Sequence, residues 1–195
     1  MVRVILIRPG TTDYDEQGRI KGTLDIPLNE FGNDQIARTA NELADLGIEM
    51  VYSSPCQAAE ETAAVLCSAL ALKSKTVNRL QNLDHGLWQG KLIDEIKSTQ
   101  RKVYKQWQEQ PDTVCPPEGE TMSSTRQRVQ IALEKILKKH KSGTIAIVVP
   151  GPLASIVRSY LDQTDLGNLW QAETECGSWM AIDVPDDKVL ASSLE

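Results

Sequence analysis

Residues 143–149 read GTIAIVV and residues 2–7 read VRVILI, two short apolar runs rich in branched side chains. Runs of this length that are bounded by glycine or proline are typical of buried strands in the middle of a sheet. Residues 50–53 predict a third strand. Shorter strands are expected at residues 76–77, 178–184 and 188–192.

Helical patterns fill the stretches between these strands. They cover residues 31–46, 56–71, 91–110, 121–139 and 152–162. Strands that alternate with helices predict a three-layer α/β/α sandwich around a mostly parallel sheet. No repeat, linker or low-complexity tract interrupts the pattern, so residues 1–195 are expected to form a single domain.

The composition narrows the classes of function. The chain has 195 residues and a net charge of −6, which argues against broad electrostatic binding to nucleic acid or to a membrane. No apolar run reaches the roughly 18 residues of a membrane span, and the strand-like start of the chain leaves no room for a signal peptide. The four cysteines form no CxxC pair. We therefore expect a cytoplasmic protein with reduced thiols, no metal site and no cofactor.

The strands at 2–7 and 143–149 end in distinctive loops. The first is followed by Arg8-Pro9-Gly10 and a long polar stretch to residue 31, and the second by Pro-Gly-Pro at residues 150–152. Open α/β sheets bind their ligands beyond the carboxyl ends of the strands. These two loops are therefore the expected walls of a functional cleft.

Five segments, in order along the chain, resemble motifs of one known family. They are LIRPGTTDYDEQGRIKGTLDIPLNEFG (residues 6–32), YSSPCQAAEETA (52–63), LQNLDHGLWQGK (80–91), EGET (118–121) and IVVPGPLAS (147–155). The first is similar to an opening signature Arg-His-Gly-Glu-Thr followed by Gly-Arg-x-x-Gly, and the last to a strand that ends in a second histidine. On these segments the chain resembles the histidine phosphatase superfamily, which implies a phosphoglycerate mutase-like fold.

The resemblance also implies a chemistry. In the family a neutral histidine attacks phosphorus, two arginines and a second histidine hold the phosphoryl oxygens, and a carboxylic acid protonates the leaving oxygen. Here the two histidine positions hold Pro9 and Pro150, the second arginine position holds Ala58 and the acid position holds Asn82, so only Arg8 remains. Proline has no titratable nitrogen. Three lost charged hydrogen bonds would cost on the order of 5–9 kcal/mol of phosphate affinity.

These substitutions predict a catalytically inactive pseudoenzyme that binds an unidentified protein partner or a small ligand in the remodelled cleft. The candidate ligand-binding residues are Arg8, Thr11, Asp15 and His85. Thr11 stands where the signature has glutamate, Asp15 where it has asparagine, and His85 at a phenylalanine position. We expect no catalytic residue at the degenerate positions.

Two alternatives stay open. The chain could be a phosphatase or other hydrolase with displaced catalytic residues, for which Thr11, Thr12 and His85 supply the candidate side chains. It could instead be a structural subunit of a homo-oligomer. One of Trp107 and Trp170 is expected as an aromatic anchor in a homodimer or partner interface.

One further expectation concerns charge within the cleft. Arg8 follows a buried strand, where an unpaired guanidinium is unfavourable. A carboxylate at Asp15 could bind it in a bidentate manner. The sequence therefore suggests an Arg8–Asp15 ion pair that neutralises the cleft.

Overall fold

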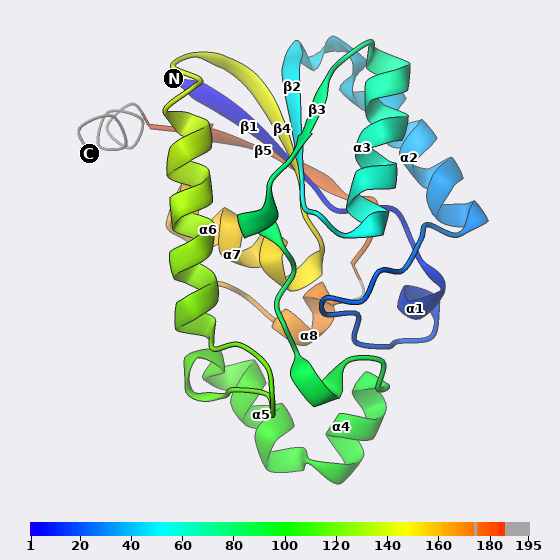
Figure 1. Cartoon of the computed structure of the whole chain (residues 1–195), viewed down its shortest axis with the longest axis vertical. Helices are drawn as coiled ribbons and strands as arrows, with labels where there is room; N and C mark the ends of the chain where they lie inside the picture. Colours follow the sequence, from blue (N-terminus) through cyan, green and yellow to red (C-terminus); the bar gives the residue numbers. More distant parts are fainter. Residues whose placement is uncertain (174, 186–195) are drawn as a thin grey trace.

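The computed structural model describes residues 1–173 and 175–185. A five-stranded sheet with the order β3-β2-β4-β1-β5 forms its centre (Figure 1). The strands are β1 (Val2–Ile7), β2 (Ile48–Ser53), β3 (Ser74–Thr76), β4 (Gly143–Val148) and β5 (Trp179–Val184). β1, β2, β3 and β4 run parallel, whereas β5 pairs with β1 in the antiparallel direction. The predicted α/β fold with a mostly parallel sheet is confirmed.

Helices connect the strands much as the sequence predicts. They are α1 (Asp13–Glu16), α2 (Glu30–Leu43), α3 (Gln57–Leu70), α4 (Ile93–Thr99), α5 (Arg101–Glu109), α6 (Met122–Leu137), α7 (Gly151–Asp162) and α8 (Leu169–Ala172). Single turns of 3-10 helix lie at Ala44–Leu46, Asn78–Leu80, Gly86–Trp88 and Pro111–Thr113. The single helix expected over residues 91–110 is two helices, because the backbone leaves the helical region at Gln100. The strand expected at residues 188–192 lies outside the described residues.

The helices cover both faces of the sheet and create two apolar cores. On one face, α2 and α3 pack on inward side chains such as Ile5 and Val148. On the other, α6 and α7 pack on Leu6 and Ile147 (Figure 1). Successive residues of β1 and β4 enter opposite cores because side chains alternate along a strand. Within the described residues, no helix has both the length and the apolar character needed to cross a membrane.

The helices α4 and α5 lie beyond the carboxyl ends of the strands, next to α8 (Figure 1). An aromatic cluster joins this region to the rest of the molecule. Trp88, Trp107 and Trp170 are mutually in contact at ring-centroid distances of 6.0–6.2 Å, and Tyr104 stacks on Trp170 at 4.9 Å. Trp107 is fully buried and Trp170 is 3% exposed. The prediction that one of these two tryptophans anchors an interface is not supported, because both side chains lie in the chain's own core.

The loop after β1 is held close to the start of α2. The amide of Gly10 donates to the hydroxyl of Thr62 at 3.1 Å, and a Cβ atom at Gly10 would lie 2.6 Å from the carbonyl oxygen of Gly32. Only glycine permits this approach. The two contacts hold the residues that follow β1 against the first turn of α2 and the amino-terminal half of α3.

Candidate functional site

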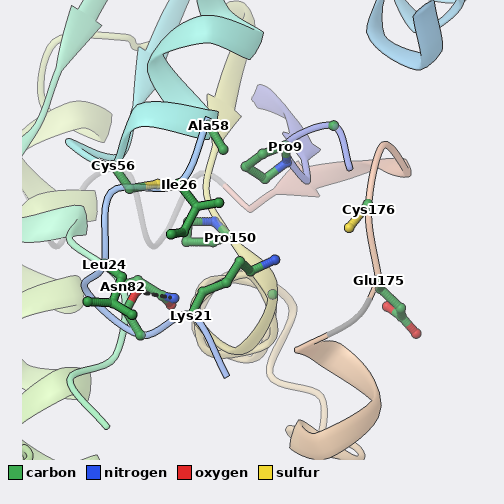
Figure 2. Close-up of a pocket in the computed structure, with 13 residues that line it drawn as sticks. Pro9, Lys21, Leu24, Ile26, Cys56, Ala58, Asn82, Pro150, Glu175 and Cys176 are labelled. Atoms are coloured by element: carbon green, nitrogen blue, oxygen red, sulfur yellow. Dashed lines mark hydrogen bonds between the residues drawn. The ribbon is translucent and has the colours of Figure 1, made fainter. Parts of the chain in front are cut away.

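The four residues to which the resemblance assigns the catalytic positions line one pocket. Pro9 follows β1, Ala58 lies in the first turn of α3, Asn82 lies on the connection before α4, and Pro150 precedes α7. The other lining residues are Gly10, Lys21, Gly22, Leu24, Ile26, Cys56, Gly151, Glu175 and Cys176 (Figure 2). The enclosed space is about 20 Å³, which is enough for a single water molecule.

A buried ammonium group reaches into this pocket. Lys21, on the loop before α2, extends toward the wall that carries Cys176 and Glu175 (Figure 2). Its amine forms a salt bridge with the carboxylate of Asp15, and the two side chains are 12% and 3% exposed. Burial is the largest single influence and acts to lower the pKa of Lys21, but the negative groups around it, Asp15 foremost, together outweigh burial and the pKa is raised. Lys21 therefore remains a cation at neutral pH.

Asp15 is held in place by local structure. Its Oδ2 atom accepts hydrogen bonds from the amide and the hydroxyl of Thr12, at 2.8 and 2.6 Å, in a capping box at the start of α1. Both residues are buried, and neither lines the pocket. The hydroxyl of Thr11 points to Gln35, 3.1 Å away, and Thr11 does not line the pocket either. In this structure both threonine hydroxyls form hydrogen bonds to neighbouring side chains and lie outside the pocket lining.

Arg8 pairs with Glu175, so the expected Arg8–Asp15 ion pair is wrong. One guanidinium nitrogen contacts the carboxylate of Glu175 and lies 3.3 Å from the hydroxyl of Ser178. Burial lowers the pKa of Arg8, and the charge of Glu175 offsets part of this effect. Asp15 could not serve as the partner because its carboxylate is already shared by Thr12 and Lys21. The cleft is neutralised internally, but through two separate ion pairs.

The two cysteines of the pocket carry protonated thiols at neutral pH. Burial raises the pKa of Cys176 to about 12, although Lys21 acts in the opposite direction. Burial likewise raises the pKa of Cys56. The thiolate is the nucleophilic form of cysteine. Neither side chain is therefore prepared to attack a substrate.

Asn82 presents an unused acceptor to the pocket. Its side-chain amide donates to the carbonyl oxygen of Gly22 at 2.9 Å. Its Oδ1 atom is buried, and the described residues provide no hydrogen-bond partner for it. Across the pocket, α7 begins at Gly151, and a helix N-terminus favours negative charge.

His85 lies away from the pocket, in the aromatic cluster. It is fully buried, and its Nε2 atom is 2.5 Å from Oε1 of Glu173, which is also fully buried. His85 is not among the residues that line the pocket. The expectation of a ligand contact at His85 is therefore not met in this structure.

The sequence did not single out Lys21 or Glu175. Lys21 lies inside the segment that resembles Gly-Arg-x-x-Gly, so a lysine flanked by glycines in a polar loop was the available signal. No feature of the sequence pointed to Glu175, because this residue is brought to the pocket by the pairing of β5 with β1.

The chain has clear relatives among known proteins. Residues 4–194 match the sequence profile of the histidine phosphatase superfamily (branch 1). The chain belongs to this superfamily. It is 29% identical, over 95% of its length and 88% of the relative's, to phosphoserine phosphatase 1 of Hydrogenobacter thermophilus.

Solved structures of other proteins share the fold. The structure of Bacillus stearothermophilus YhfR superposes with a TM-score of 0.83 at 26% identity, covering 95% of this chain and 92% of that one. A mycobacterial glucosyl-3-phosphoglycerate phosphatase gives a TM-score of 0.83 at 23% identity, covering 93% and 97%.

These relatives contradict the predicted inactive pseudoenzyme. The chain aligns along nearly its whole length with a protein named as a phosphatase. The finding agrees better with the alternative of a phosphatase or other hydrolase. The prediction of inactivity rested on the residues at positions 9, 58, 82 and 150, and it did not take into account Lys21 and Glu175, which line the same pocket.

Proposed function

We propose that this chain hydrolyses phosphate monoesters in the pocket between Pro9 and Pro150, with water attacking phosphorus. The observation that supports this most is the buried ammonium of Lys21 in a pocket at the carboxyl ends of β1 and β4. On the resemblance, positions 9 and 150 belong to the family's histidines. Because proline offers no nucleophile, the attacking group must be another one.

The phosphate group would be held by three sources of positive charge. They are the ammonium of Lys21, the N-terminus of α7 and the guanidinium of Arg8, which does not line the pocket itself but pairs with the lining residue Glu175. The present pocket holds only a water-sized space, so binding requires the wall with Glu175 to move away from Arg8. A phosphate dianion can compete for Arg8, since arginine forms strong charged hydrogen bonds with phosphate oxygens.

The release of Glu175 provides a general base. It is the one carboxylate among the described residues that line the pocket. Asn82 Oδ1 can accept a hydrogen bond from the attacking water and so orient it. As the water oxygen bonds to phosphorus, the ester bond breaks and a water proton passes to Glu175. The cations stabilise the charge that develops on the phosphoryl oxygens.

The pocket lacks a good acid for the leaving oxygen. Asn82 cannot donate a proton to it, and the raised pKa of Lys21 makes the ammonium a weak acid. A missing general acid costs about 10²–10⁴-fold in rate for a poor leaving group. The proposed substrates are therefore phosphate compounds whose leaving group needs no protonation, such as aryl phosphate esters and acyl phosphates.

A panel of substrates tests this function. We expect phosphate release from para-nitrophenyl phosphate and acetyl phosphate to exceed that from phosphoserine by about a hundredfold or more. The activity should follow the protein through a second purification and saturate with substrate. The absence of enzyme-dependent release from all three compounds contradicts the proposal, and an equal rate with phosphoserine contradicts the proposed leaving-group dependence.

A further inference from the structure

A second cavity lies between α6 and the segment that follows β3. Its volume is about 280 Å³. Its lining residues are Tyr52, Lys75, Thr76, Val77, Asn78, Arg79, Ala132, Lys135, Ile136 and Lys139, and we call this cavity the basic groove. It shares no lining residue with the pocket described above. Four of its ten lining residues are cationic and none is acidic, in a chain whose net charge is −6.

The floor of the basic groove is apolar and ordered. Tyr52, Ala132 and Ile136 are buried, with exposed fractions of 4%, 1% and 3%. The hydroxyl of Tyr52 is hydrogen-bonded to Nε2 of His140 at 2.8 Å, and the two rings meet edge to face. Burial raises the pKa of Tyr52, so its hydroxyl stays neutral. The groove thus combines a rigid apolar base with a polar rim, as small-molecule sites do.

The cations of the rim are exposed and available. Lys75, Arg79, Lys135 and Lys139 are all exposed, and the described part of the chain forms no salt bridge with any of them. The carboxylate of Glu60 accepts a hydrogen bond from the hydroxyl of the lining residue Thr76. Like charges gathered around one cavity repel each other, and a bound anion relieves that repulsion.

We infer that the basic groove binds a small polyanion that carries at least two phosphate groups. Four separate cations match a ligand with several negative charges better than a ligand with a single charge. Arginine and lysine are the residues that usually bind phosphate oxygens. The cavity lies close to the lower limit of about 300 Å³ for small-ligand sites, which indicates a compact ligand. The net negative charge of the chain argues against an extended nucleic acid.

Calorimetric titration with inorganic pyrophosphate and tripolyphosphate tests this inference. We expect saturable binding of one ligand per chain. The variant Lys135→Met with Lys139→Met should weaken it about tenfold or more, because two charged contacts are lost. The matched control is Lys102→Met with Lys105→Met, which changes the net charge equally on α5 and should leave the affinity within about twofold.

The two histidines of the chain give an independent readout. Pyrophosphate should shift the ring resonances of His140, which bonds to the floor, and leave those of buried His85 unchanged. Binding should also persist in Lys21→Met with Asp15→Asn, so the site can be present even if the proposed phosphatase activity is not. Equal weakening by the control variant overturns the inference. So does binding to DNA or anionic vesicles without binding of either polyphosphate.

Discussion

The ammonium of Lys21 and the carboxylate of Asp15 form a salt bridge in which both side chains are largely buried. Neither partner can be removed alone without leaving a buried charge, which costs about 3–5 kcal/mol of folding stability. The pair therefore serves two purposes. It fixes the loop that precedes α2, and it delivers a cation to the pocket at the end of β1.

Replacing Glu175 should separate binding from catalysis. In Glu175→Gln, the base is lost and Arg8 is no longer neutralised. We expect kcat for para-nitrophenyl phosphate to fall about 10²–10⁴-fold. The affinity for inorganic phosphate should rise, by about tenfold, because no carboxylate competes for the guanidinium.

Steady-state kinetics with phosphate as a competitive inhibitor measure both quantities. Glu118→Gln, a change at an exposed acid away from the pocket, is the control and should alter neither value. A parallel loss of phosphate affinity and kcat in Glu175→Gln would show that Glu175 acts only by supporting the structure.

The His85–Glu173 pair should dominate the stability of the region around α8. Both side chains are fully buried, and the atoms Nδ1 of His85 and Oε2 of Glu173 have no hydrogen-bond partner among the described residues. His85→Phe alone leaves a buried carboxylate and should reduce the free energy of unfolding by about 3–5 kcal/mol. Adding Glu173→Gln should restore most of that loss, because the stranded charge is then gone.

Denaturant unfolding of the two single variants and the double variant forms a complete cycle. Losses that simply add in the double variant would show that the two residues do not form the coupled pair seen in the structure.

Cys176 should make the fold less stable in alkali. Its pKa rises from an ordinary value of 9.0 to about 12 because the thiol is buried. Below pH 9 the folded and unfolded chains both keep the proton. Between pH 9 and about pH 12 the unfolded chain releases the thiol proton of Cys176 while the folded chain keeps it, so the free energy of unfolding decreases as pH rises.

Cys176→Ala should therefore flatten the alkaline decrease in stability measured by denaturant unfolding. Cys115→Ala, which removes an exposed thiol, is the matched control and should leave the slope unchanged. Identical slopes in wild type and Cys176→Ala would mean that the thiol is not buried as described.

Much of the fold could be predicted because buried parallel strands are continuous apolar runs. Residues 2–7 and 143–149 are such runs, and β1 and β4 coincide with them almost exactly in extent. The break between α4 and α5 was missed because Gln100 is neither glycine nor proline. The antiparallel direction of β5 could not be predicted, because a short strand of alternating polarity has the same sequence pattern in either direction.

The pocket was predicted in outline but not in its charges. The walls follow from chain order, since Pro9 and Pro150 each lie two residues beyond the end of one of two neighbouring strands. The ion partners do not follow from chain order. The carboxylate of Asp15 lies next to Lys21 because a capping interaction with Thr12 holds it there. Charge pairing in a loop depends on the geometry of its turns, and the residue types alone do not determine that geometry.

The most direct test of the proposed hydrolysis is the turnover of para-nitrophenyl phosphate by wild type and by Lys21→Met with Asp15→Asn. The double change removes the pocket cation without leaving a buried carboxylate, so the fold should be retained and circular dichroism can verify this. We predict saturable wild-type turnover and a loss of kcat/KM of about tenfold to a hundredfold in the variant, equal to the removal of one charged hydrogen bond. No wild-type turnover above the buffer rate, or equal kcat/KM in the two proteins, would contradict a phosphatase that acts through the Lys21 pocket.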